Sequence, residues 1–76
     1  MKNSNLIQAR KAMGLTQEQL ARKMNYRKSA VSNWENGYSV PSVNDAMKLA
    51  IILNTNIPFL FFNHYVQIYH TLYIDG

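Results

Sequence analysis

Four side chains that can hydrogen-bond to the edges of nucleic-acid bases lie at helical spacing near the middle of the chain. We refer to them as the polar face: Lys28, Ser29, Ser32 and Asn33. A lysine can donate to guanine O6 and N7, and an asparagine can bridge adenine N6 and N7. A serine hydroxyl can contact more than one kind of base. On a helix these residues would lie away from the apolar side formed by Ala30, Val31 and Trp34. These side chains can contact bases only if the neighbouring helices hold them toward solvent.

Two short helices joined by a tight turn would position the polar face. The spacing predicts a helix over residues 28–35, which Gly37 ends. The preceding helix begins at Thr16, a good N-cap, and Gln19 three residues later completes a capping-box pattern. Asn25 suits a left-handed position between the two helices, because asparagine tolerates a positive φ better than most residues. This layout is typical of a helix-turn-helix, which places its second helix in the DNA major groove.

Three more helices are predicted outside this unit. Apolar spacing favours a first helix over residues 5–13, which Gly14 stops. A fourth helix begins after Ser42, whose side chain can cap it. A short fifth helix follows Asn56, with a proline in its first turn, where proline costs little. The sequence therefore predicts a mainly α fold of five helices over residues 1–63.

The last segment, residues 64–76, differs in character. Its β-branched and aromatic residues nearly alternate, which favours a β-strand. A helix is the alternative, because four residues would form a helical stripe: Tyr65, Ile68, Tyr69 and Leu72. A lone strand on a helical domain has unpaired backbone groups. We therefore hypothesise that this tail pairs with a second copy of the chain and holds a homodimer.

The composition narrows the classes of function. The 76 residues make one domain, and without cysteine the chain has neither a disulfide nor a thiolate metal site. No signal peptide is visible and the longest apolar run, residues 57–62, is too short to span a bilayer, so we expect a cytoplasmic protein that does not enter a membrane. The net charge is +4, and seven of the eight lysines and arginines lie in the first 28 residues, which suits a polyanion such as DNA.

Catalysis and metal binding are not expected. The two histidines, His64 and His70, have no acid near them in the sequence except Asp75, which does not complete a set of metal ligands. Four acidic residues, no cysteine and no glycine-rich phosphate loop leave little that an enzyme could use. We therefore expect no cofactor and no enzymatic activity.

Three stretches of the sequence together resemble a known family: residues 10–21 (Arg-Lys-Ala-Met-Gly-Leu-Thr-Gln-Glu-Gln-Leu-Ala), residues 31–37 (Val-Ser-Asn-Trp-Glu-Asn-Gly) and the pair Pro41-Ser42. They look like the Cro/CI-type (XRE) helix-turn-helix family, and the resemblance covers residues 6–62. It implies a lambda-repressor-like bundle of five helices. It also implies binding to operators in double-stranded DNA, usually as a dimer, in bacterial, plasmid and phage regulators.

The resemblance implies roles for individual residues as well. The polar face matches the family's base contacts, whereas Gln17 at the start of the second helix and Asn36 after the third match phosphate contacts. Arg10 and Glu35 match a structural ion pair that ties the first helix to the third. Arg27 departs from the family pattern, which has Ser or Thr as the cap of the third helix. An arginine cannot accept the capping hydrogen bond, so we assign its guanidinium to a phosphate.

These expectations converge on a sequence-specific transcription regulator, a repressor or Cro-like switch, that binds a palindromic operator as a homodimer through residues 28–35. Two other functions stay open. An antitoxin of a toxin–antitoxin pair would keep the DNA-binding fold and use the tail to bind a toxin. A protein-interaction module that has lost DNA binding would show no steep salt dependence with duplex DNA.

Overall fold

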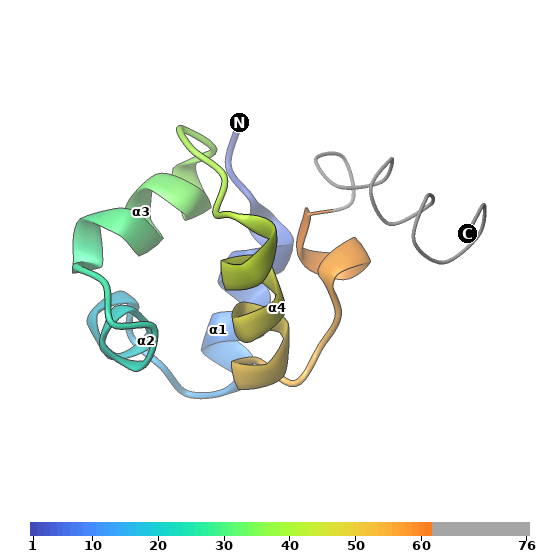
Figure 1. Ribbon diagram of the computed structural model, residues 1–76, viewed down its shortest axis with the longest axis horizontal. Helices are drawn as coiled ribbons and strands as arrows, with labels where there is room; N and C mark the ends of the chain where they lie inside the picture. The colour runs from blue at the N-terminus through green and yellow to red at the C-terminus, as the bar shows by residue number, and fades with distance from the viewer. Residues whose placement is uncertain (62–76) are drawn as a thin grey trace.

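Helices make up the regular structure of residues 1–61, the part of the chain that this computed structural model describes (Figure 1). Four longer helices follow one another as α1 (Ser4–Ala12), α2 (Gln17–Lys23), α3 (Lys28–Asn36) and α4 (Val43–Ile52). A short fifth helix covers residues 57–61. The prediction of a mainly α fold with five helices is therefore confirmed. The predicted strand in the tail, residues 64–76, lies outside the described residues.

Side-chain caps start the helices where the sequence predicts them. At α2 the Thr16 hydroxyl accepts from the Gln19 N–H at 3.0 Å, and the Thr16 N–H donates to the Gln19 side-chain oxygen at 2.9 Å, which completes the capping box. The Ser42 hydroxyl accepts at 3.2 Å from the N–H three residues later, at the start of α4. The Asn56 side chain does the same at 2.8 Å for the short fifth helix. Each cap satisfies a first-turn N–H that has no partner within its helix.

Residues in the left-handed conformation end the helices. Gly14 follows α1 with φ 71°, Asn25 follows α2 with φ 61° and Gly37 follows α3 with φ 77°. Asn54 closes α4 in the same way, with φ 55°. At Gly37 a side chain would also clash, because a Cβ there would meet the carbonyl oxygen of Met1. The chain therefore turns sharply after each helix and brings its N-terminus against the end of α3.

Asn3 is a cap that the sequence analysis missed, and α1 consequently begins at Ser4, one residue earlier than predicted. The Asn3 side-chain oxygen accepts from the Leu6 N–H at 3.0 Å, and its amide donates to the Leu60 carbonyl at 2.7 Å. Its backbone N–H donates to the Glu35 carbonyl at 2.8 Å. One residue thus joins the start of α1 to the end of α3 and to the short fifth helix.

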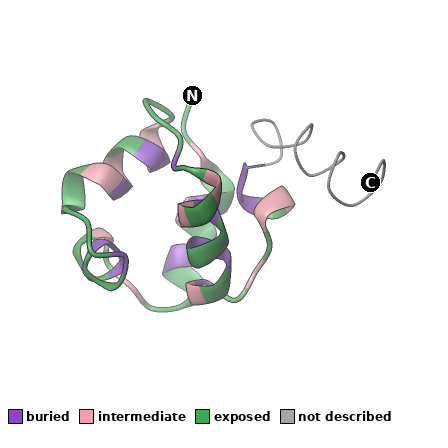
Figure 2. Ribbon diagram, viewed as in Figure 1, coloured by how far each residue is buried: buried purple, intermediate pink, exposed green. Residues whose placement is uncertain are grey.

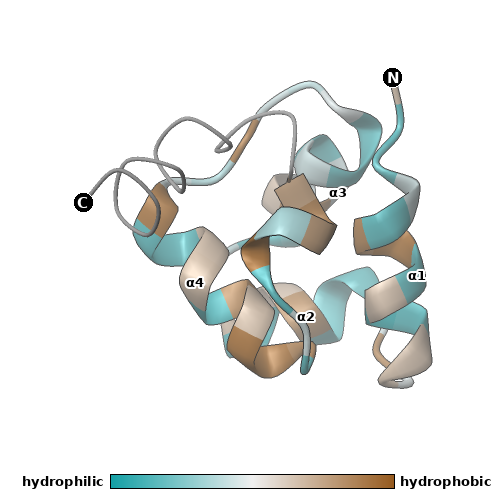
Figure 3. Cartoon of the chain, turned by 90° about the vertical axis from the view of Figure 1, so that its right-hand side faces the viewer, coloured by the Kyte–Doolittle hydropathy of each residue, from teal (hydrophilic) through white to brown (hydrophobic). Residues whose placement is uncertain are grey.

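The core lies where the inner sides of the helices meet, and Figure 2 shows buried residues on every helix. The largest fully buried side chains come one from each of the four longer helices: Leu6, Leu20, Val31 and Leu49. Leu60 and Phe61 of the fifth helix complete the cluster. Hydrophilic and hydrophobic residues alternate along the ribbons in Figure 3, as expected of helices that bury one side. Within residues 1–61 even the longest helix, α4 with 10 residues, is too short to cross a membrane.

The start of α3 lacks a side-chain cap, because Arg27 occupies the cap position and makes no capping hydrogen bond. Arg27→Ser supplies a hydroxyl that can accept from a first-turn N–H, whereas Arg27→Ala removes the same guanidinium without supplying one. We expect the serine variant to exceed the alanine variant by about 1 kcal/mol in the free energy of unfolding. Urea denaturation followed by circular dichroism measures the difference, and equal stability of the two variants would contradict the prediction.

Candidate nucleic-acid interface

The turn between α2 and α3 fixes the two helices as one unit. The Tyr26 N–H donates to the Ala21 carbonyl at 2.8 Å, and the Asn25 N–H donates to the Arg22 carbonyl at 3.1 Å. The two helices pack against each other through buried residues that include Ala21 and Val31. Helix α3 therefore has one side in the core and the other side toward solvent, which is the arrangement of a helix-turn-helix.

The polar face lies together on the outer side of α3. Lys28, Ser29 and Asn33 are exposed, and Ser32 is half-buried. Asn36, which is also half-buried, donates from its side-chain amide to the Ser32 hydroxyl oxygen at 3.3 Å. The structure thus brings the four expected base-contacting residues onto one accessible side of a single helix, with Asn36 one turn further along.

A buried ion pair holds α3 against α1. Arg10 Nε donates to Glu35 Oε2 at 2.6 Å and Arg10 Nη2 donates to Glu35 Oε1 at 3.2 Å, with the two side chains 10% and 4% exposed. The remaining guanidinium nitrogen, Nη1, donates to the Leu15 carbonyl at 2.8 Å in the turn between α1 and α2. Two parallel bonds fix orientation as well as distance. The structure therefore brings Arg10 and Glu35 together as a nearly buried pair that joins α1 to α3.

Gln17 is turned inward at the start of α2. Its Nε2 donates to Glu35 Oε1 at 2.9 Å, and the residue is half-buried. The Glu35 carboxylate therefore accepts from both α1 and α2. The bond to Glu35 uses one of the two donors of the Gln17 amide. The expected phosphate contact can then come from the second donor or from the Gln17 backbone N–H, which a first helical turn leaves without an intrahelical acceptor. Nothing in the local sequence signals the inward contact, because the two residues are 18 positions apart.

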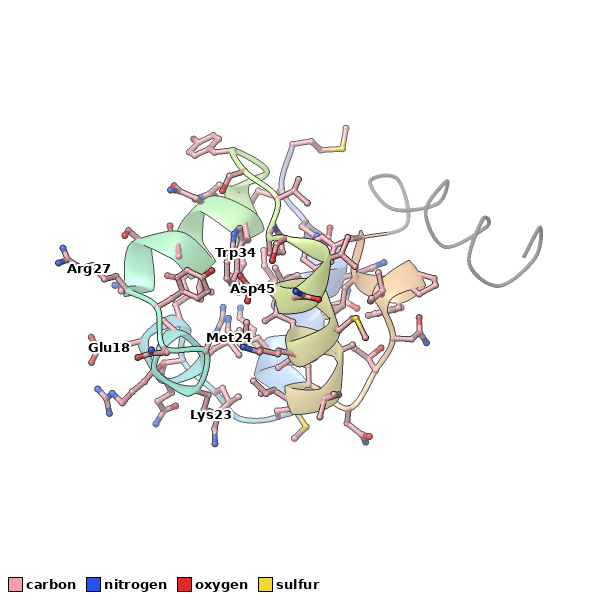
Figure 4. All side chains as sticks on the ribbon, viewed as in Figure 1. Glu18, Lys23, Met24, Arg27, Trp34 and Asp45 are labelled. Atoms are coloured by element: carbon pink, nitrogen blue, oxygen red, sulfur yellow. The ribbon has the colours of Figure 1, made fainter. Side chains whose placement is uncertain are left out.

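Positive charge gathers around the start of α3. Arg27 projects away from the protein at this end of the helix, whereas Lys23 of α2 points to a different side of the molecule (Figure 4). Lys11 and Lys28 line an open hollow together with the first turn of α2, and Gln17 is part of the same lining. Cations of α1 and α3 therefore lie near one end of the polar face, although the acidic Glu18 lines the same hollow. Such cations favour an anionic partner.

Metal binding finds no support in the described part of the chain. Within residues 1–61 no three acidic or histidine side chains come together as metal ligands do. The two histidines weighed above, His64 and His70, lie outside the described residues.

Removal of Glu35 would leave the Arg10 guanidinium buried without a countercharge. We expect Glu35→Ala to lower the free energy of unfolding by about 3–5 kcal/mol, the usual cost of breaking a buried pair by removing one partner. Glu18→Ala is the matched control, because it breaks a pair with Arg22 at 3.1 Å whose side chains are 67% and 74% exposed. That change should cost less than about 1 kcal/mol. Thermal and urea unfolding measure both, and comparable losses in the two variants would refute the structural role.

Comparison with known proteins supports the same interpretation. A family model described as Helix-turn-helix matches residues 6–60, which include most of α1, all of α2 to α4, the polar face and the ion pair. No curated protein and no solved structure matches the chain. At the level of this family the protein is a DNA-binding transcription regulator. The chain belongs to the Cro/CI-type (XRE) helix-turn-helix family.

Proposed function

We propose that this protein is a sequence-specific repressor or Cro-like regulator that reads a palindromic operator in double-stranded DNA through α3. The observation that carries the proposal is the placement of the polar face on the solvent side of α3, while the opposite side of the same helix is buried. A helix presented in this way can enter the major groove, where each base pair offers a distinct pattern of donors and acceptors.

The polar face would supply the base contacts. Lys28 suits guanine and Asn33 suits adenine, so we propose a half-site that contains a G·C pair and an A·T pair. Ser29 and Ser32 add contacts from the same side of α3 that do not select one kind of base. The order of these base pairs does not follow from the side chains, because no fixed code relates residue to base.

The phosphate contacts would come from the ends of α2 and α3. Arg27 is exposed at the start of α3 and can clamp a phosphate with its guanidinium. Asn36 lies at the other end of α3, and Gln17 offers its backbone N–H at the start of α2. Phosphate contacts carry no sequence information, but they fix the register in which α3 meets the bases.

Two copies of α3 are needed to read a palindrome. In a symmetric dimer they would meet successive major grooves about 34 Å apart. We propose that residues 1–63 form the DNA-binding domain and that residues 64–76 hold the homodimer. Ile51 and Phe59, exposed on α4 and the fifth helix, offer apolar surface that a partner copy could cover. A dimer on its operator in the cytoplasm would block access of RNA polymerase to the promoter.

The antitoxin alternative depends on a toxin-binding role for the tail. The tail lies outside the described residues, and no observation within residues 1–61 favours a toxin as partner. Regulation through DNA therefore remains the proposal that the described residues support.

Asn33→Ala tests base reading directly. Selection of bound duplexes from a random pool defines the operator, and fluorescence anisotropy then measures affinity for every single-base change in it. We expect the variant to lose about 1–3 kcal/mol of discrimination focused on one position, because one side chain serves one base pair. An unchanged pattern of base preference would show that Asn33 is not one of the side chains that read the bases.

Two lysines provide the control for this experiment. Lys28 lies on the polar face, whereas Lys48 is exposed on α4, outside the α2–α3 unit. Lys28→Ala should weaken operator binding, and Lys48→Ala should leave affinity and preference as in the wild type. Wild-type affinity should fall steeply with salt, since DNA binding releases counterions. Binding that does not respond to salt would overturn the proposal and favour a protein-interaction module.

Truncation after Phe62 tests the role of the tail. We expect the truncated chain to sediment as a monomer, because the segment that we assign to pairing is gone. It should also lose affinity for a full palindrome while it keeps its preference for a half-site. A full-length chain with residues 64–76 replaced by a glycine–serine sequence is the control for length. A truncated chain that remains a dimer would rule the tail out as the dimer contact.

A further inference from the structure

Tyr26 connects the turn before α3 to α4, and none of the contacts assigned above uses its side chain. Its ring meets Trp34 edge-on, with ring centroids 5.4 Å apart and an angle of 82° between the planes. Its hydroxyl donates a hydrogen bond to a carboxylate oxygen of Asp45, in the first turn of α4. The turn residue thus reaches past the buried indole of α3 to a helix outside the helix-turn-helix unit.

Within residues 1–61, no side chain of residues 27–30 makes a hydrogen bond that holds the start of α3. No side chain caps it, because Arg27 occupies the cap position. The backbone contributes the bond from the Ala30 N–H to the Arg27 carbonyl at 3.0 Å, and the bond from the Tyr26 N–H to the Ala21 carbonyl at 2.8 Å. A side-chain bond made by the residue before the cap therefore restrains the end of α3 that carries Lys28.

The acceptor of this bond is held firmly. Asp45 lies in the first turn of α4, where its N–H donates to the Ser42 hydroxyl at 3.2 Å. Asp45 and Trp34, both labelled in Figure 4, each contact Tyr26. The hydrogen bond to the Asp45 carboxylate raises the pKa of the Tyr26 phenol. The hydroxyl therefore keeps its proton and remains the donor at neutral pH.

We propose that Tyr26 is a positioning residue for DNA reading: its hydrogen bond to Asp45 fixes the first turn of α3 relative to α4 and sets how Lys28 and Ser29 meet the bases. The effect on DNA rests on the proposed function, whereas the effect on α3 does not. Base contacts depend on the position of each side chain, but the attraction of cations to phosphates tolerates small displacements. Loss of the bond should therefore reduce affinity for the operator more than affinity for unrelated DNA.

Tyr26→Phe and Asp45→Ala, made singly and together in the full-length chain, test this proposal, because each removes one partner of the hydrogen bond. The phenylalanine keeps the ring against Trp34 and removes only the hydroxyl. Without DNA, we expect amide hydrogen exchange at Ala30 and Val31 to accelerate about two- to tenfold, as for the loss of one hydrogen bond. With DNA, the ratio of operator affinity to affinity for a random duplex should fall by a similar factor. The double variant should lose no more than the single variants, because both changes remove the same bond.

Asn56→Ala is the control for a merely structural effect. It removes the cap of the short fifth helix, where the Asn56 side chain accepts from the Phe59 N–H at 2.8 Å, and leaves the α2–α3 turn intact. At matched overall stability it should leave exchange in the first turn of α3 and the affinity ratio as in the wild type.

Two results would overturn the proposal: wild-type exchange in the first turn of α3 in Tyr26→Phe, or an equal loss of affinity for operator and random duplex in that variant. A wild-type protein without any operator preference would overturn the proposed function instead, and accelerated exchange in Tyr26→Phe would still support the positioning of α3.

Discussion

The carboxylate of Glu35 is the point on which the arrangement of the first three helices depends. It accepts two hydrogen bonds from Arg10 of α1 and one from Gln17 of α2, while the Glu35 backbone carbonyl accepts from the Asn3 N–H. Both members of the ion pair are nearly shielded from water, so neither charge can be left alone without a large cost. Apolar contacts tolerate small rotations of a helix, whereas a two-point ion pair does not. The pair therefore selects the rotation of α3 that turns its polar side outward.

Local rules account for what could be predicted from the sequence, and long-range packing accounts for what could not. The caps at Thr16 and Ser42 and the stop at Gly37 involve residues no more than a few positions apart, so the sequence specifies them directly. The contacts that were missed join distant segments: Asn3 with Leu60, Gln17 with Glu35 and Tyr26 with Asp45. No local pattern says which of several amides or hydroxyls meets a given acceptor, because helix packing decides it. The pairing of Arg10 with Glu35, 25 positions apart, was accessible only through the family resemblance.

The polar side chains of the candidate site differ in whether they already make hydrogen bonds within the protein. The side chains of Lys28 and Asn33 are exposed and make no hydrogen bond within residues 1–61, so only water must leave them when a base arrives. Ser32 already accepts from Asn36, which leaves its hydroxyl hydrogen to be donated elsewhere. One donor of the Gln17 amide is already used by Glu35. On the proposed function, Lys28 and Asn33 are thus the side chains most free to discriminate between bases, whereas Gln17 also holds α2 against α3.

The missing side-chain cap at the start of α3 bears on both the stability of the protein and its proposed binding to DNA. A capping oxygen at position 27 would add about 1 kcal/mol to a small domain, but the chain has a cation there instead. Arg27 and Lys28 are consecutive cations, and Lys11 lines the same hollow as Lys28, so like charges repel in the free protein. On the proposed function, a DNA phosphate that meets Arg27 relieves this repulsion and brings oxygens to the first-turn N–H groups that lack a cap. A partner that binds only the folded state also stabilises it. On this proposal, DNA would secure a turn that lacks a side-chain cap in the free protein, and the hydrogen bond from Tyr26 to Asp45 would restrain that turn before the DNA binds.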